Sequence, residues 1–253
     1  MPAIEEALPV LAPTAVAVGL LMAVTTGVLW WSRAQHRFAP ALAVVRGALQ
    51  LALISLVLSG VITDPLWVTC TLLVMFSVAV VTTTRRIGFT RRNLLFVATG
   101  IACGTVVTLG LVFATGAIAA EPRYLLAIGG IVIGNTMSIA TLAGRHLRES
   151  TRARWEEVEG WLALGATPRH STMDLARTAV HSALIPSTDQ TRTTGLVTLP
   201  GAFVGAIFGG VSPLEAGRFQ VVVLASLMAA GSLAAVVLVY GLAPAKLKPD
   251  PLD

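Results

Sequence analysis

Charged side chains are scarce in this sequence. Asp, Glu, Lys and Arg together make up 12% of its 253 residues, about half of what a soluble domain carries. Apolar residues make up 55% and gather in long runs without charge. This pattern excludes an ordinary water-soluble domain as the bulk of the chain, and we expect lipid to surround most of the polypeptide.

Cysteine and histidine are also few. Cys70 and Cys103 lie within apolar runs, and neither has a second cysteine or a histidine at the spacing of metal ligands. We therefore expect neither a disulfide nor a metal site from them. The four histidines are scattered over polar segments, so the identity of any metal ligand stays unknown.

The common catalytic motifs are missing. No GxxxxGK[ST] sequence is present, so the chain cannot hold ATP phosphates in a P-loop. It has no HExxH sequence and no plausible Ser-His-Asp order in its loops. We expect no enzymatic activity in this chain and no cofactor bound directly by it.

Seven apolar segments are long enough to be membrane spans. They predict an all-α integral membrane protein with about seven transmembrane helices. The expected spans are Leu8 to Trp31, Ala41 to Ile62, Leu66 to Thr82, Leu94 to Ala119, Tyr124 to Ala143, Thr194 to Gly210 and Phe219 to Ala243.

The basic residues predict the orientation. Thirteen arginines and two lysines, out of 18 basic residues, follow spans one, three, five and seven. By the positive-inside rule the N-terminus lies outside and the C-terminus is cytoplasmic. The excess of basic residues behind the net charge of +5 is therefore explained by membrane topology, and we expect no nucleic-acid partner. The arginine- and alanine-rich composition suggests a bacterial inner membrane.

Glycines recur at intervals of four within three spans. The pairs Gly100 with Gly104 and Gly130 with Gly134, and the row Gly201, Gly205 and Gly209, are typical of close helix packing in lipid. Packing within the chain and contact between two copies both fit this pattern.

The connection from Gly144 to Thr193 is far longer than any other and is expected to be cytoplasmic. Trp155, Val158 and Leu162 predict one apolar face of a helix over 145–163, with an Arg152–Glu156 pair on the polar side. Gly165 ends that helix. Thr167 and Pro168 then predict the cap and first residue of a second helix over 168–184, which Pro186 interrupts.

The segment Glu159 to Pro168 (EGWLALGATP) resembles the coupling loop of ABC importer-type permeases, which fits a cleft on the ATPase subunit. That loop has a Glu with a Gly six positions later, as Glu159 and Gly165 are here. The chain departs from the pattern at Gly160 and Trp161, where alanines are usual. The resemblance assigns coupling to Glu159, Leu164, Gly165, Ala166, Thr167 and Pro168.

A wider resemblance covers Val45 to Val239. Five segments are similar to the FetB family of iron-export ABC permeases, in the family's order and spacing. They are 45–51 (VRGALQL), 134–137 (GNTM), 164–168 (LGATP), 184–189 (LIPSTD) and 194–201 (TGLVTLPG). That family is similar to plant aluminium-tolerance permeases, which also work with a separately encoded ATPase.

The resemblance implies one transmembrane permease domain over residues 1–253, with a cytoplasmic coupling segment at about 144–193. It implies export of iron or another metal species, driven by ATP-Mg on a cytoplasmic ABC ATP-binding subunit, and a permease homodimer in the bilayer. The chain departs from the family at Ala202 and Phe203, where family members can carry methionines.

Several residues within or beside the spans, most of them polar, are candidates for gating or for lining the pathway. Arg46 can snorkel to the headgroups or anchor the coupling segment by pairing with Asp189. Asn135 and Met137 lie two apart, so they share no helical face and form no joint metal site. The full set of candidates is Arg46, Gln50, Asn135, Met137, Asp189, Arg192, Pro200 and Gly201.

Two other functions fit the sequence. A secondary transporter or channel would need ionisable residues in mid-membrane, of which the predicted spans contain almost none. A membrane scaffold would use the long loop to bind a partner that is not an ATPase. An ATP-binding subunit encoded next to this chain would favour the permease.

Overall fold

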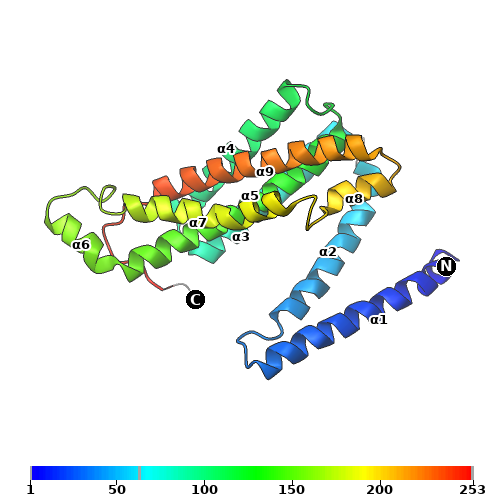
Figure 1. Ribbon diagram of the computed structural model, residues 1–253, viewed down its shortest axis with the longest axis horizontal. Coiled ribbons are helices and arrows are strands. Elements are labelled where there is room, and N and C mark those ends of the chain that lie inside the picture. The colour runs from blue at the N-terminus through cyan, green and yellow to red at the C-terminus, as the bar shows by residue number, and fades with distance from the viewer. Residues whose placement is uncertain (1, 62–63, 252–253) are drawn as a thin grey trace. The chain divides into compact units, whose positions relative to one another are not determined.

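The computed structural model describes the backbone of residues 2–61 and 64–251, and the side chains of 13–55 and 64–251. In these ranges the chain forms nine helices, and its β-structure is one isolated bridge between Thr194 and Thr198 (Figure 1). The predicted all-α membrane fold is confirmed. The helices divide into two compact units, α1–α2 and α3–α9.

The first unit is a pair of apolar helices. Helix α1 (Pro2–Trp31) and helix α2 (Ala39–Val61) pack against each other. Arg33 and His36 have positive φ in the turn between them. The guanidinium of Arg37 lies 5.6 Å from the ring centre of Trp30, a cation–π contact that fixes the turn beside the end of α1.

Four long helices form the framework of the second unit. They are α3 (Pro65–Ile87), α4 (Arg91–Ala114), α5 (Pro122–Ala153) and α9 (Pro213–Leu242). Helix α5 packs against α3, α4 and α9, and α4 packs along α9. Together with α1, they are the five described helices that are long and apolar enough to cross a membrane; α2 is apolar over Ala39–Ser55.

Arginines gather where α3 ends, α4 begins and α5 ends. We call this the basic end of the second unit; it holds Arg85, Arg86, Arg91, Arg92 and the last turns of α5. The other end carries Arg123 and Arg218. The 23 residues of α3 measure about 34 Å, enough to cross a hydrocarbon core of about 30 Å.

One of the predicted glycine pairs, Gly100 with Gly104, lies at a close helix contact. The position of a Cβ on Gly100 would lie 3.0 Å from the carbonyl oxygen of Ala234, and one on Gly104 would lie closer still to that of Ala230. On α5, a Cβ on Gly130 would approach the Met75 methyl group, whereas the Cβ position of Gly134 meets no neighbouring helix within 4 Å. The α4 pair thus packs within the chain, against α9.

The sixth predicted span is wrong as a continuous helix. Helix α8 (Gly201–Phe208) has 8 residues and measures about 12 Å, less than half of a hydrocarbon core. Residues 194–200 form a turn in which the Gly195 N–H donates to the Thr198 carbonyl. Gly195 has φ of 89° and Pro200 lacks an N–H, so neither residue favours a continued helix.

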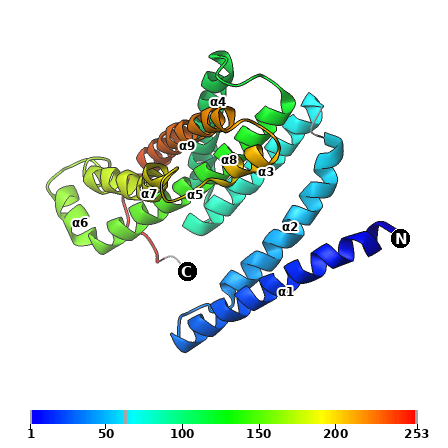
Figure 2. The same ribbon diagram turned by 45° about the vertical axis from the view of Figure 1, so that its right-hand side comes forward.

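Helix α7 (Met173–Thr193) returns along the framework before α8. It packs against both α5 and α9, beside which it lies in Figures 1 and 2. The predicted bounds of 168–184 are wrong at both ends: residues 168–172 form turns, and Pro186 lies inside α7. The sequence segment assigned to a loop therefore forms part of the helix bundle.

The predicted helix over 145–163 is two helices. Helix α5 continues to Ala153 and α6 (Trp155–Ala163) follows a break at Arg154. The side chain of Arg154 bonds to Glu157 at 2.6 Å, and Arg152 donates to the Pro249 carbonyl. The predicted Arg152–Glu156 pair is replaced by these contacts.

Candidate functional site

Helix α6 and the turn after it form a tip beyond the basic end, seen at the left of Figure 1. Val158 is fully buried, with Trp155 and Leu162 partly buried, in a cluster that also contains residues of α5, α7 and α9. The apolar face predicted from these three residues is confirmed. Because one cluster joins four helices, the tip is attached directly to the membrane-spanning framework.

The turn at Gly165 ends α6 in a defined geometry. The N–H of Ala166 donates to the Trp161 carbonyl and the N–H of Gly165 donates to the Leu162 carbonyl, both at 3.0 Å. These two bonds make a Schellman motif, whose C′ residue needs a positive φ. Gly165 has φ of 89°, so the predicted helix stop is confirmed and glycine is the residue that fits it.

The outer surface of the tip is apolar in part. Leu164 is 83% exposed and Trp161 is 45% exposed, and the ring of His170 meets Trp161 edge-on at 5.9 Å between centroids. Thr167 caps the following turn by accepting from the His170 N–H. Glu159, also exposed, adds a carboxylate to this surface.

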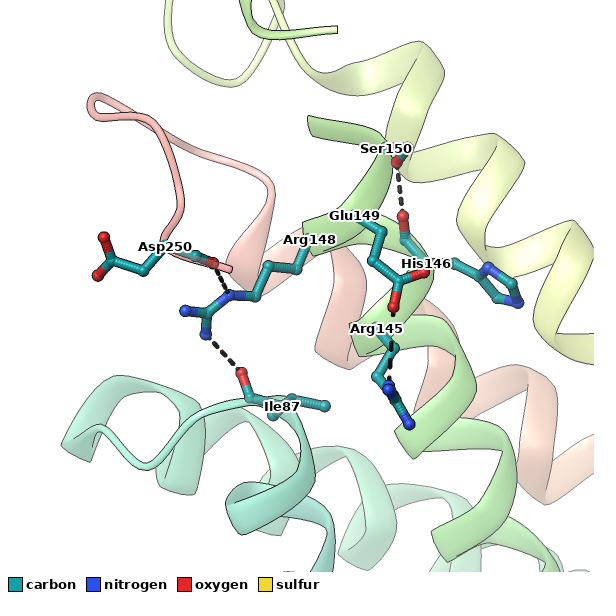
Figure 3. A network of polar contacts seen from close by, with 7 residues as sticks. All are labelled: Ile87, Arg145, His146, Arg148, Glu149, Ser150 and Asp250. Atoms are coloured by element: carbon teal, nitrogen blue, oxygen red, sulfur yellow. Dashed lines mark hydrogen bonds and ion pairs between the residues drawn. The ribbon is translucent and has the colours of Figure 1, made fainter. Parts of the chain in front are cut away.

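Arg148 connects three segments at the basic end. Figure 3 shows its guanidinium donating to the Ile87 carbonyl at the end of α3 (2.7 Å) and to the Asp250 carbonyl in the C-terminal tail (3.0 Å). Arg145 instead pairs with Glu149 on its own helix, at 3.8 Å. Arg148 is thus a structural cross-link, which its place in a basic loop did not reveal.

Small residues hold α7 against the framework. Ala176, Ala179 and Ala183 are buried with Leu175 in the cluster that includes Ala143 of α5 and residues of α9. At the start of α7 the Thr172 hydroxyl donates to the carbonyl of Ala243, at the end of α9, at 2.5 Å. Alanines allow the backbones to lie close together where larger side chains would separate them.

Asn135 joins α5, α7 and α9 deeper in the unit. Its amide nitrogen donates to the Leu227 carbonyl and its amide oxygen accepts from the Ser187 hydroxyl, both at 3.4 Å. Met137 faces away from this junction, in the cluster formed with α3 and α4. The prediction that these two residues share no face is confirmed.

The remaining candidates are not brought together. Asp189 pairs with Arg192 on α7, at 3.6 Å. Pro200 precedes α8 and Gly201 begins it. Arg46 and Gln50 are exposed in the first unit, so the pairing of Arg46 with Asp189 stays a prediction.

The sequence reasoning missed the full extent of α7. Exposed polar residues recur on it at Asp174, Arg177, His181, Asp189 and Arg192, a spacing that keeps them on one side of a helix. Pro186 concealed this period, because a helix was expected to end before it.

The sequence profile of the Uncharacterised protein family (UPF0014) matches residues 13–245. The chain belongs to this family. Its relatives are membrane proteins, and this chain is likewise a multi-pass membrane protein.

Proteins from plants and bacteria are similar to this chain. UPF0014 membrane protein STAR2 of Oryza sativa subsp. japonica is 37% identical over 78% of this chain and 70% of its own length. Protein ALUMINUM SENSITIVE 3 of Arabidopsis thaliana is 34% identical over 78% of this chain and 73% of its own length. The "Probable iron export permease protein FetB" of Escherichia coli (strain K12) is 33% identical over 55% and 54%. No solved structure matches the chain.

Proposed function

We propose that this chain is the permease subunit of an ABC-type exporter. Its residues 1–253 form one permease domain in the bacterial inner membrane, and the basic end of the second unit faces the cytoplasm. Two copies bind two ABC ATP-binding subunits, which hold ATP-Mg, and the cargo is iron or another metal species. The name of the Escherichia coli relative supports the permease role and the cargo.

The observation that carries this proposal is the tip. It exposes Leu164 and Trp161 at the end of the unit where arginines gather, and apolar side chains surrounded by polar ones are typical of a docking surface. Val158 packs the tip against α5, α7 and α9. ATP-driven closure of the partner would therefore move three helices through one contact cluster, which biases the permease between two states.

The experiment compares two glycines of the tip in complexes with the ATP-binding subunit encoded beside this chain. Gly165→Val forces a β-branched residue into a positive φ and distorts the docking turn. Gly160→Ala is the matched control, because Gly160 is helical and no described atom lies within 4 Å of its Cβ position. The measurements are complex formation, ATPase activity with iron added, and ATP-dependent iron uptake by inverted vesicles.

We expect Gly165→Val to reduce ATP-dependent uptake by about tenfold or more, as loss of about 1.4 kcal/mol of coupling would do. Gly160→Ala should keep uptake and ATPase activity near those of the parent. Equal uptake in both variants would refute the coupling role of the tip. An active complex that is indifferent to every metal tested would refute the cargo and leave the permease role standing.

A secondary transporter is the second candidate, since Asp189 and Arg192 lie on a helix packed against two apolar spans. Ionisable residues at such positions serve ion coupling in transporters. Uptake that follows an ion gradient and proceeds without the ATP-binding subunit would favour it. Uptake that depends on ATP hydrolysis would exclude it.

A further inference from the structure

Helix α7 has a side that is polar except at Ile185, opposite its buried alanines. We call this side the polar stripe of α7; its residues are Asp174, Arg177, Thr178, His181, Thr188, Asp189 and Arg192. Successive members are one or three residues apart, except for one interval of seven between His181 and Thr188. Ile185 occupies the same side of the helix within that interval, so all the members lie on one side. Thr188 is half-buried and the other members are exposed.

Three hydrogen bonds place the stripe along the depth of the bundle. Thr172, before α7, bonds to Ala243 at the end of α9, whereas Ser187 meets Asn135, which in turn bonds to Leu227 in the middle of α9. The 16 residues from Leu227 to Ala243 span about 24 Å of helix. The stripe therefore extends beside most of a hydrocarbon core of about 30 Å.

The surface of the stripe differs from the lipid-compatible surfaces of its neighbours. The exposed side chains of α4 and α9 in this region include Val106, Leu111 and Val221. The stripe instead carries two ion pairs, Asp174–Arg177 at 3.1 Å and Asp189–Arg192 at 3.6 Å, with all four side chains exposed. Charged groups at membrane depth face protein or a water-filled cavity, because hydrocarbon does not solvate them.

The end of the stripe coincides with a break in the helix. After Thr193 the chain leaves helical geometry for seven residues before α8 begins. Non-helical backbone at membrane depth occurs where it is buried in protein or lines a cavity, and interrupted helices surround the transport sites of many permeases. The break itself exposes the apolar side chains of Leu196, Val197 and Leu199, so it is the stripe that indicates a polar environment.

We propose that the polar stripe of α7 forms one wall of a water-filled translocation pathway. This inference rests on the permease function proposed above and extends it to named residues. The wall offers carboxylates, guanidinium groups, an imidazole and hydroxyls, so it suits a hydrophilic solute that keeps its hydration or exchanges it for hydrogen bonds. A lipid-like cargo would find no apolar surface there except Ile185.

The experiment measures the reactivity of single cysteines toward water-borne reagents. Cys70→Ala with Cys103→Ala gives a background without cysteine. His181→Cys and Thr188→Cys then place a thiol on the stripe, about 14 and 24 Å along α7 from Thr172. Val106→Cys and Val221→Cys are matched controls on apolar surfaces, where the native side chains are 68% and 66% exposed.

Each variant is reconstituted in vesicles and treated with a charged, membrane-impermeant thiosulfonate and, in parallel, with a permeant maleimide. The thiolate is the reacting form and hydrocarbon disfavours it, so we expect the stripe cysteines to react with the charged reagent at least ~10-fold faster than the controls. Equal, slow reaction at all four positions would overturn the proposal. So would disulfide cross-linking of the stripe to another protein without any charged labelling.

The labelling needs no ATP-binding subunit, and its outcome is therefore independent of the coupling experiment at Gly165. Fast labelling of the stripe with no ATP-dependent uptake would support the pathway and contradict the ABC mechanism. Slow labelling with intact coupled uptake would contradict the pathway and support the ABC mechanism.

Discussion

Asn135 illustrates how much a single side chain can contribute within this bundle. It is the residue through which α5, α7 and α9 meet by hydrogen bonds, each 3.4 Å long. Interhelical hydrogen bonds in membranes average about 0.6 kcal/mol. Their contribution to stability is modest, but their directions fix how α7 is placed on the other two helices.

We expect Asn135→Ala to lower the free energy of unfolding by about 1 kcal/mol, since it removes two such bonds. The measurement is thermal unfolding of the purified protein in detergent. Ser138→Ala is the matched control, because the Ser138 hydroxyl bonds within α5, to the Gly134 carbonyl. Equal stability of the two variants would show that the Asn135 bonds do not contribute.

The residue-level predictions from sequence succeeded where one side chain determines local geometry. Gly165 ends a helix because a positive φ is needed there. The sequence indicates this end, because a glycine follows the apolar helical pattern and Thr167 and Pro168 come shortly after it. Arg148 could not be predicted in the same way. Its partners are the carbonyls of Ile87 and Asp250, which are distant in sequence. Because every residue has a backbone carbonyl, the residue types in the sequence do not show which carbonyl an arginine will bind.

Helices α4 and α9 pack along each other in the second unit. Gly100 and Gly104 let the two backbones approach at Ala234 and Ala230. Lipid offers helices no hydrophobic drive to associate, so such contact depends on close packing. The pair is therefore sensitive to added volume on that side of α4.

We expect Gly104→Val to destabilise the protein by about 1–3 kcal/mol, the usual cost of overpacking. Gly110→Val on the same helix is the control, since no described atom lies within 4 Å of the Cβ position of Gly110. Both changes carry the same propensity cost in a helix, so the difference between their unfolding temperatures measures the contact. A difference near zero would contradict close packing at Gly104.

Hydropathy predicted the framework helices well and α7 poorly, for a physical reason. A helix that faces lipid is apolar on all sides, and α3, α4, α5 and α9 show this along their apolar stretches. Helix α7 buries a narrow side of small residues and exposes polar ones, so its average hydropathy resembles that of a loop. The break at residues 194–200 then depends on Gly195 and Pro200 together, and either alone is tolerated within a membrane helix.

At the scale of the whole molecule, the basic end is held together by arginines that donate to backbone carbonyls. Arg92 reaches the carbonyls of Gly241 and Pro244, and Arg148 reaches those of Ile87 and Asp250. These bonds connect α3, α4, α5 and the tail after α9 at the basic end. The same residues that indicate topology therefore also hold the C-terminal tail in place.

We expect Arg148→Ala to release the tail, because it removes the donor shared by the tail and α3. Limited proteolysis by trypsin after Lys246 should accelerate severalfold, as expected when local opening becomes easier. Arg145→Ala is the control, since Arg145 pairs with Glu149 on its own helix. Equal cleavage rates in the two variants would contradict the cross-link.

Pro186 has a mechanical consequence for α7. Since proline has no N–H, the carbonyl of Ser182 loses its partner in the helix, and the helix can bend there at little cost. The part before Pro186 is fixed by alanine packing against α5 and α9, while the part after it meets Asn135 through a long 3.4 Å bond. The part of α7 after Pro186, which carries Asp189 and Arg192, is therefore held by fewer packing contacts than the part before it, and Pro186 is the position at which a bend in α7 would cost least.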